Sequence, residues 1–532
     1  SRRAFLKVSM LASGALLVGT GWVRDARAGL DGETWKPNLY VRIDRDGTIT
    51  IVSKNPEAGQ GVKTAFPMVV AECLAVDWQQ VNVEQAPLDD RYGRQAIGGS
   101  RGTPDGWDDL RIAGTGALYL LTHAAAVQWG VPAAECTARS GVIHHEDSGR
   151  TAPYQALLDA AADVPVPDVS ALKLKSRPEE FKLLGTFVPG VDNPKILTGQ
   201  PLFGCDVRKE GMLYAQYVKC PVFGGKVRKA NVDAVADLPG ITHAFVVEGT
   251  DDLSGLMPGV ALVGETWWAV NSAREKLQVD WATTHSDSSE GFAAEAKRLA
   301  ETSGAVQRHD GDVDAALDAA EKIVEASYYY PFVSHCNLEP QVATALYHES
   351  GRLEMWAPTQ NPRGARGLIA RTLGMPEENI HIELERIGGG FGRRLTHDYM
   401  VETAWIARVV KKPVQLQWTR EDDLQHDHYR PAAWHHFRAG IGSDGRMSAF
   451  DHHFITFGRN GKTVSGAGLS PRHYPAGLVP NFRLRQSIID CNVPTGPWRS
   501  PGHSAYCWAY QSFFDEVALA AERDQLAFRL DL

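Results

Sequence analysis

The chain has 532 residues, 43% of them apolar, and a formal net charge of −9. This length and composition allow large buried cores and predict two or more domains. The sequence has no long basic tract, which argues against nucleic acid as a partner. Its seven cysteines are scattered and form no C-x-x-C pair. This spacing argues against a zinc ribbon or an iron–sulfur cluster within the chain, and an odd number argues against a complete disulfide framework.

The first 28 residues have the features of an export signal. Residues 1–7 read SRRAFLK, an apolar run follows at 8–18, and small residues stand at Ala26 and Ala28. The apolar run is too short to span a bilayer, and the pattern predicts a cleaved signal peptide over 1–28. The adjacent arginines resemble the twin-arginine signal, which predicts a periplasmic protein that folds around a cofactor before export.

Residues 29–163 combine strands with two glycine loops. Alternating apolar residues on either side of Asp46-Gly47 predict a hairpin over 40–52. The first loop, 57–64, contains Gly59-Gln60-Gly61 and precedes a helix that runs to Leu74. The second, 98–103, precedes a helix predicted from Asp108 to Trp129. Each polar loop therefore lies just before a helix.

The remainder predicts an α+β protein with further parts. Residues 164–189 form a linker and 190–282 a small α+β domain, in which strands near 213–215, 244–247 and 260–263 alternate with helices at 231–236 and 268–277. An acidic connector, 283–325, leads to a main domain, 326–532. This domain has strands at 324–330, 342–347 and 353–356, a hairpin at 443–445, and a final helix from about 505 to 532. Histidine pairs at 144–145, 435–436 and 452–453 fall on strands, where neighbours face opposite ways, so we interpret them as core or surface residues.

A third glycine loop, 387–394, lies between a predicted strand (380–385) and a predicted helix (397–411). Glycine lets a ligand approach main-chain amides, and the following helix start presents unpaired N–H groups. Phe391 interrupts the glycines, which a ligand-free turn does not require. The spacing fits neither G-x-G-x-x-G nor the Walker pattern, so a nicotinamide dinucleotide and a Walker-type nucleotide are disfavoured. The loop predicts contact with an anionic or bulky cofactor.

Five segments together resemble the molybdopterin-binding large subunit of the xanthine dehydrogenase family. They are Gly59-Gln60-Gly61, Gly98-Gly99-Ser100-Arg101, Ala357-Pro358-Thr359-Gln360-Asn361, Gly388-Gly389-Gly390-Phe391-Gly392 and Pro494 to Gly502. Because two of the loops precede the small domain, the order is most similar to isoquinoline 1-oxidoreductase β subunits and periplasmic aldehyde dehydrogenases. The resemblance implies molybdenum-hydroxylase large-subunit architecture, with pterin-binding α+β domains around a small hammerhead-like α/β domain.

The resemblance also implies a role for each segment. The cofactor is molybdopterin with molybdenum, in its cytosine dinucleotide form, and no protein side chain ligates the metal. Gln360 is the catalytic residue, which hydrogen-bonds the apical oxo ligand. The implied cofactor-binding residues are Gln60, Gly61, Thr64, Gly99, Ser100, Arg101, Gly102 and Thr103 at the pyrophosphate and nucleotide end, Gly389, Gly390, Phe391 and Gly392 at the dithiolene end, and Arg499.

The implied reaction oxidises an aldehyde or an aromatic N-heterocycle, such as an isoquinoline, with water as oxygen donor. Electrons would pass to a separate small 2Fe-2S subunit and on to a cytochrome c. The family carries a catalytic glutamate after the W-R-S-P-G segment, and these 532 residues contain no counterpart. We therefore expect that the C-terminal part of the subunit is missing and that the chain as given is inactive. Arg393 and Arg394 also stand where many relatives carry Gly-Lys.

Two alternatives remain open at this stage. Gly98 to Gly102 satisfies G-x-S-x-G and makes Ser100 a candidate nucleophile of a serine hydrolase, although the residues before it are polar rather than a buried strand. The other alternative is a cofactor-free scaffold paralogue with the same fold, kept for docking a partner.

Overall fold

The computed structural model describes residues 30–283 and 287–532, so the predicted signal peptide lies outside the described residues. Contacts divide the chain into two compact units. The first unit comprises residues up to Glu210, Ala343–Gly389 and Ala407–Pro413. The second unit comprises Gly211–Val342, Gly390–Ile406 and Val414–Leu532. Each unit is therefore built from segments that are far apart in the sequence.

The first unit begins with a five-stranded sheet. Its strands lie in the order β1 (Leu30–Asp31), β2 (Thr34–Trp35), β3 (Val41–Asp44), β4 (Ile49–Ser53) and β5 (Val81–Gln85). The predicted hairpin is confirmed, because β3 and β4 pair antiparallel across the Asp46-Gly47 turn. Helix α2 (Val62–Leu74) packs on this sheet and against α3 (Gly102–Trp129), and the three elements bury one apolar core.

Helix α3 starts six residues before the predicted position. Pro104 lies in its first turn, where a missing N–H costs no hydrogen bond, so the proline does not delay the helix. Near its middle, a Cβ on Gly114 would lie 2.5 Å from the Val70 carbonyl oxygen, which explains how closely α2 and α3 pack. By length and composition α3 is the one described helix that could cross a membrane, but 56% of its apolar window is buried in the protein. It is the core helix of this unit.

The rest of the first unit consists of smaller elements. They are the sheet of β6 (Cys136–Arg139), β7 (Val142–His145) and β8 (Arg150–Pro153), helices α4 (Leu158–Asp163) and α5 (Asn193–Leu197), and the group of β16 (Val342–Tyr347, here from Ala343), β17 (Leu353–Ala357), α10 (Pro362–Leu373) and β18 (Ile380–Leu384). The predicted linker contains only short 3-10 turns. The buried carboxylate of Glu72 on α2 accepts three main-chain N–H bonds, from Lys182, Leu183 and Leu184, and so fixes the linker to the core.

The second unit contains most of the predicted small domain. Strands β11 (Ile241–Val247), β12 (Gly259–Gly264) and β9 (Leu213–Lys219) are consecutive neighbours, β10 (Lys226–Ala230) pairs with β13 (Val279–Ala282), and helices α6 (Val232–Ala236) and α7 (Trp267–Arg274) pack nearby. Strand β9 also pairs in parallel with β19 (Val414–Gln417). The predicted 190–282 domain thus shares its sheet with a later segment, and residues 190–210 group with the first unit.

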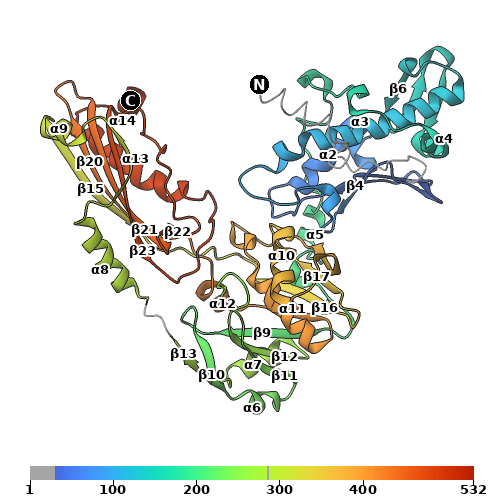
Figure 1. Cartoon of the computed structure of the whole chain (residues 1–532). Helices are drawn as coiled ribbons and strands as arrows, with labels where there is room; N and C mark the ends of the chain where they lie inside the picture. Colours follow the sequence, from blue (N-terminus) through green and yellow to red (C-terminus); the bar gives the residue numbers. More distant parts are fainter. Residues whose placement is uncertain (1–29, 284–286) are drawn as a thin grey trace. The chain divides into compact units, whose positions relative to one another are not determined.

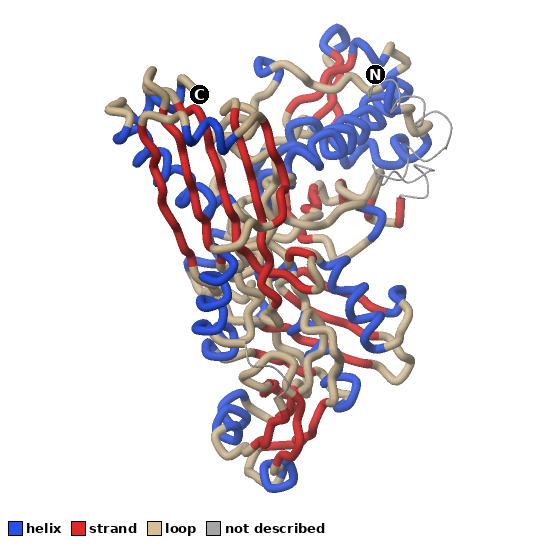
Figure 2. The backbone as a smooth tube through the Cα atoms, turned by 60° about the vertical axis from the view of Figure 1, so that its left-hand side comes forward, coloured by secondary structure: helices blue, strands red, loops and turns tan. Residues whose placement is uncertain are grey.

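A long sheet dominates the second unit, and Figures 1 and 2 show its strands side by side. The order is β14 (Ala305–Asp310), β23 (Asn481–Asp490), β21 (Met447–Arg459), β20 (Ala433–Ile441) and β15 (Lys322–Tyr330), with β22 (Lys462–Thr463) paired to β21. Helices α8 (Ser289–Ala300), α9 (Val313–Asp318) and α13 (His503–Ala520) pack on it, and α14 (Gln525–Leu530) packs on α13. The unit also holds α12 (Arg420–Gln425) and α11 (Asp398–Val410) up to Ile406.

Two predictions about this unit were wrong. The connector 283–325 is an integral part of it, since it supplies α8, β14 and α9. The final helix is not continuous, because it ends at Ala520 and a new helix begins where the Asp524 side chain caps Ala527 N–H. The histidine pairs do alternate between strand faces. His435 and His452 point into an aromatic core and hydrogen-bond each other at 3.0 Å.

Candidate functional site

A buried carboxylate accepts hydrogen bonds from the G-Q-G loop of the first unit. Glu57, only 3% exposed, accepts N–H bonds from Gly59 (2.7 Å), Gly61 (3.1 Å) and Lys63 (2.9 Å). Gly59 and Gly61 have φ values of +91° and +89°, which favour glycine, and a Cβ added to either would meet nothing within 4 Å. The loop therefore has a fixed inner side and open space at its two glycines.

The side chains predicted to bind at this loop are engaged within the unit. Gln60 folds back on its own loop, accepting from Ala58 N–H at 2.6 Å and donating to the Pro56 carbonyl at 2.9 Å. The Thr64 hydroxyl oxygen accepts from Val191 N–H at 3.0 Å and is buried. Binding at this loop would therefore rely on main-chain atoms rather than on these two side chains.

The G-G-S-R loop leads into the N-terminus of α3. Gly99 and Ser100 both have positive φ, +64° and +56°. No side chain caps the helix at Arg101, which pairs with Asp105 at 2.5 Å. The N-terminal end of a long helix favours an anion. Residues 86–99 contain no strand, so Ser100 lacks the buried strand that a nucleophile elbow requires.

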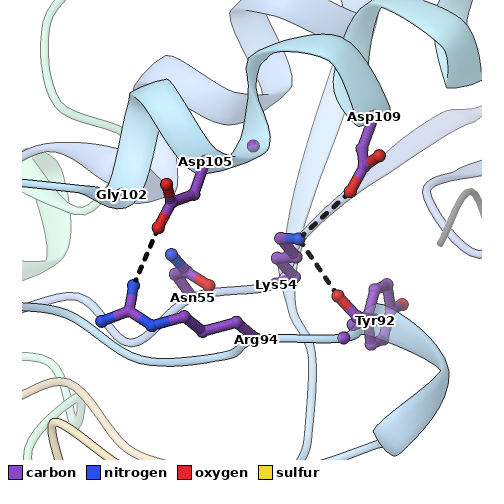
Figure 3. Close-up of a pocket in the computed structure, with 9 residues that line it drawn as sticks. Lys54, Asn55, Tyr92, Arg94, Gly102, Asp105 and Asp109 are labelled. Carbon is purple, nitrogen blue, oxygen red and sulfur yellow. Dashed lines mark hydrogen bonds and ion pairs between the residues drawn. The ribbon is translucent and has the colours of Figure 1, made fainter. Parts of the chain in front are cut away.

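A small polar cavity of about 100 Å³ lies beside the start of α3, and Gly102 is in its lining (Figure 3). The Lys54 ammonium points into it, 3.1 Å from the Tyr92 carbonyl and 3.7 Å from Asp109. Burial lowers the pKa of Lys54, and the Asp109 carboxylate offsets part of that effect. A second pair, Arg94 and Asp105, is 3.3 Å apart. The cavity is thus polar but close to neutral. Thr103, the last predicted residue of this loop, is exposed in the first turn of α3.

Gln360 lies beside the G-G-S-R loop. It is 7% exposed and follows β17. Two hydrogen bonds join it to Ile97. Ile97 N–H donates to the main-chain carbonyl of Gln360 at 2.9 Å, and the side-chain amide of Gln360 donates to the main-chain carbonyl of Ile97 at 3.3 Å. The third glycine segment is joined in the same unit, because Ile387 N–H donates to the Glu57 carbonyl at 2.8 Å. The first unit thus brings together the G-Q-G loop, the G-G-S-R loop, Gln360 and the start of the 387–392 segment.

The second unit carries the end of that segment and the W-R-S-P-G segment. Phe391 is 41% exposed at φ +52°, and Gly392 has φ +109°. A Cβ on Gly392 would lie 1.5 Å from the Pro497 carbonyl oxygen, so the two backbones are in direct contact. Arg499, two residues after Pro497, is exposed. The turn at Phe391-Gly392 and the chain just before Arg499 therefore meet through a main-chain contact. Of the other predicted residues, Gly389 (φ +105°) ends the first unit and Gly390 is buried.

One buried carboxylate organises this region, and we call it, with its donors, the Asp427 hub. Asp427 is 1% exposed and accepts bonds from the Ser334 hydroxyl (2.7 Å), the His335 main chain (2.5 Å) and ring (3.0 Å), and His428 N–H (2.6 Å). Arg393 Nε lies 3.0 Å away. Burial alone would raise the pKa of Asp427, but the His335 hydrogen bond and the Arg393 charge lower it to about 2. The sequence did not reveal this hub.

Arg393 and Arg394 are structural in this chain. Both are at most 1% exposed. Arg393 pairs with Asp398 at 2.9 Å as well as with the hub, and Arg394 pairs with Glu339 at 3.0 Å. Their guanidinium groups pair with these buried carboxylates, so both side chains hold the loop in place.

Among the described residues, one group of three side chains has the spacing of metal ligands: Glu135, His145 and Asp147, within 4.8 Å of one another. Both ring nitrogens of His145 are already hydrogen-bonded, to Glu135 at 3.1 Å and to Ser148 at 2.7 Å. Both carboxylates are exposed. The group therefore gives no reason to assign a metal.

Comparison with known proteins identifies the class. Residues 295–531 and 16–182 each match a molybdopterin cofactor-binding domain. The chain is 30% identical to the β subunit of isoquinoline 1-oxidoreductase from Brevundimonas diminuta, over 93% of this chain and 70% of that protein. It is 27% identical to a membrane-bound aldehyde dehydrogenase (pyrroloquinoline-quinone) of Gluconacetobacter polyoxogenes, over 100% of this chain and 72% of that protein. These matches define a molybdopterin-binding protein.

Solved structures show the same fold. Quinoline 2-oxidoreductase from Pseudomonas putida 86 matches with a TM-score of 0.54 at 19% identity, over 65% of this chain and 50% of that one. The aldehyde oxidoreductase from Desulfovibrio gigas matches with a TM-score of 0.53 at 18% identity, over 71% and 46%. The chain belongs to the molybdopterin-binding large subunits of the xanthine dehydrogenase family, as the five segments predicted.

The residues present fit such a cofactor. The uncapped start of α3 suits phosphate oxygens bound by main-chain N–H groups, and the open space at Gly59 and Gly61 leaves room for a ligand at the first loop. Gln360 supplies a neutral amide, held in place by Ile97, next to the G-G-S-R loop. The individual binding roles of these residues stay predictions.

Proposed function

We propose that this chain is the large subunit of a periplasmic molybdenum hydroxylase that oxidises an aldehyde or an aromatic N-heterocycle, with water as oxygen donor. The observation that carries the proposal is the reciprocal pair of bonds between Gln360 and Ile97, which fixes the amide beside the G-G-S-R loop. The names of the similar proteins, isoquinoline 1-oxidoreductase and aldehyde dehydrogenase, support these two substrate classes.

When bound, molybdopterin supplies the two-electron oxidation and the transfer of a water-derived oxygen. The chain's own residues would bind and orient. Main-chain N–H groups at the start of α3 would hold the phosphates of the cytosine dinucleotide form, the open space at Gly59 and Gly61 would leave room for the cofactor, and the Gln360 amide would donate a hydrogen bond without adding charge. The resemblance assigns cofactor contacts to Phe391 and Arg499 as well. We assign no described carboxylate to the role of general base.

Electrons must leave this chain for a partner. Two relatives, an isoquinoline 1-oxidoreductase and a nicotinate dehydrogenase, are named as single subunits of their enzymes, which indicates multi-subunit assemblies. We propose a small 2Fe-2S subunit as the direct acceptor and a cytochrome c beyond it. Co-purification of a small subunit with the iron and acid-labile sulfide content of one 2Fe-2S cluster per chain would test this; purification of an active large subunit alone would contradict it.

The test of the catalytic role is Gln360→Ala in the full-length subunit with its partner. Loss of one preorganised donor predicts about a 10²-fold fall in kcat. Gln216→Ala is the matched control, since Gln216 is also buried but lies in β9 of the second unit. Turnover equal to wild type in Gln360→Ala would remove this residue from the site.

Metal analysis separates the enzyme from the scaffold paralogue. Full-length protein from a molybdenum-competent host is expected to carry about one molybdenum per chain, with a releasable pterin dinucleotide. Trace molybdenum alone would favour the scaffold.

Export is tested separately. Replacing Arg2 and Arg3 by lysine should keep the protein in the cytoplasm, as expected for a twin-arginine signal. Unchanged periplasmic yield would refute that route.

A further inference from the structure

His335 connects the Asp427 hub to the W-R-S-P-G segment. Its Nδ1 lies 3.0 Å from an Asp427 carboxylate oxygen and its Nε2 lies 3.2 Å from the Pro497 carbonyl oxygen. Both partners only accept hydrogen bonds, because Asp427 is ionised and a carbonyl has no proton to donate. The His335 ring therefore lies between two acceptors, one at each ring nitrogen. His335 is 6% exposed, so water does not readily replace either partner.

The Pro497 carbonyl is the point at which two loops touch. The preceding residues are held by main-chain bonds, from Tyr429 N–H to the Pro494 carbonyl (3.0 Å) and from Gly496 N–H to the Tyr429 carbonyl (3.1 Å). Pro497 itself has no N–H to continue that ladder. Its carbonyl oxygen instead accepts from His335 and lies against Gly392. The ring therefore fixes the last anchored carbonyl before Trp498 and Arg499.

We propose that His335 is a positioning residue, which, held by Asp427, fixes the Pro497 carbonyl against Gly392 and so sets the relative placement of Phe391 and Arg499. The inference rests on the proposed function for its catalytic consequence, but its structural part concerns the chain alone. Four chain segments then move together. They are 334–335, 392–393, 427–428 and 494–497. Displacing the ring releases both loop ends.

Hydrogen exchange on this chain tests the structural part without any cofactor. In His335→Gln, which cannot serve both acceptors with the same geometry, amides of 391–394 and 498–500 should exchange about tenfold faster, while those of β21 stay unchanged, as expected for local opening. His453→Gln is the matched control, since His453 is buried in the same unit and its ring bonds Ser487 at 2.8 Å, outside the hub. Wild-type exchange in both loop segments would overturn the proposal.

Asp427→Asn provides a second variant, with Asp451→Asn as its control. Asp451 is equally buried and pairs with Arg483 and Arg485, outside the hub. Only the Asp427 change should loosen 391–394 and 498–500. Equal loosening of 391–394 and 498–500 in both variants, or a rise in β21 exchange alongside these loops in Asp427→Asn, would show general destabilisation and reject the positioning role.

The catalytic consequence is measured in the full-length holoenzyme. In His335→Gln, kcat per bound molybdenum should fall about tenfold while KM stays within about twofold, as expected when only the reacting geometry is disturbed. His453→Gln should change neither. Altered exchange with unaltered kcat would support the structural role of His335 but remove its catalytic role. Full-length protein that purifies without molybdenum would instead refute the proposed function and leave the exchange result intact.

Discussion

Both units hold a glycine loop on a buried carboxylate, but they recruit the donors differently. Glu57 in the first unit accepts from main-chain N–H groups two, four and six residues along the chain. Asp427 in the second unit accepts from Ser334 and His335, more than 90 residues earlier in the sequence, and pairs with the charged Arg393. We call the first arrangement, in which a carboxylate binds main-chain N–H groups of its own loop, the local wrap. We call the second, in which segments far apart in the sequence meet at one carboxylate, the clasp.

This difference decides what surrounds the glycines. At Gly61 the local wrap leaves the outer side open, with nothing within 4 Å of an added Cβ. At Gly392 the clasp brings in the Pro497 carbonyl, 1.5 Å from where a Cβ would be. An open loop can accept a ligand at its backbone, whereas a packed one transmits the position of one segment to another. Alanine at the two glycines should separate these cases.

Gly392→Ala should be the most damaging substitution of the set. It combines backbone strain at φ +109° with a clash against another backbone, which cannot be relieved by a rotamer change. We expect a loss of about 3–5 kcal/mol in the free energy of unfolding of the second unit. Gly61→Ala, at φ +89° but in open space, should cost only about 1–2 kcal/mol. Denaturant unfolding of both variants measures the difference.

Equal losses in the two alanine variants would mean that backbone strain alone decides the cost and that the Pro497 contact has no energetic weight. Gly59→Ala is a further control, because Gly59 has φ +91° and is also open. It should match Gly61→Ala rather than Gly392→Ala.

The local elements were predictable from the sequence because their signals are local. The strand predicted over 380–385 is β18, and the helix predicted over 397–411 is α11, within one residue at each end. The connector 283–325 was missed for a different reason. Its strand β14 is mostly exposed and becomes a strand only through pairing with β23, nearly 180 residues later. No periodicity within the segment reveals that partner.

The site residues divide in the same way, into those with a local signal in the sequence and those brought together only by folding. Glycine marks positive φ, so Gly59, Gly61 and Gly392 were recognisable from spacing. Glu57 could have been added, since a carboxylate two residues before a glycine loop is in reach of its N–H groups. The Asp427 hub could not, because its donors come from segments that meet only in the folded chain.

Glu57→Gln tests whether the local wrap depends on a charged acceptor. An amide must turn an N–H donor toward one of the main-chain donors, so we expect a loss of about 2 kcal/mol and faster exchange at Gly59, Gly61 and Lys63. Glu72→Gln is the matched control, because Glu72 is similarly buried and also accepts main-chain bonds, from the linker. It should lose stability without altering exchange in the G-Q-G loop. Unchanged exchange there in Glu57→Gln would mean that the loop is held by other contacts.

The last effect concerns how the stability of the second unit depends on pH. Glu402 is fully buried and accepts bonds from Lys219 (2.8 Å) and Trp418 (2.9 Å). Burial raises its pKa to about 7, although the Lys219 charge opposes that rise. Between its usual value near 4.5 and pH 7, the folded chain keeps a proton that the unfolded chain has released. Stability from this group is thus present below about pH 4.5 and is lost as the pH rises through 7.

Glu402→Gln should therefore remove the fall in stability that the wild type shows between pH 4.5 and 7. Urea unfolding at half-unit pH steps measures the slope. Lys219→Met gives the opposite change, because loss of the ammonium raises the pKa of Glu402 further and extends the decline to higher pH. Asp427 titrates near pH 2 and so contributes nothing within this window. If Glu402→Gln keeps the wild-type slope, the buried Lys219–Glu402 pair stays charged between pH 4.5 and 7. The second unit then accommodates a buried ion pair, just as the first unit accommodates the buried Glu57 carboxylate among main-chain donors.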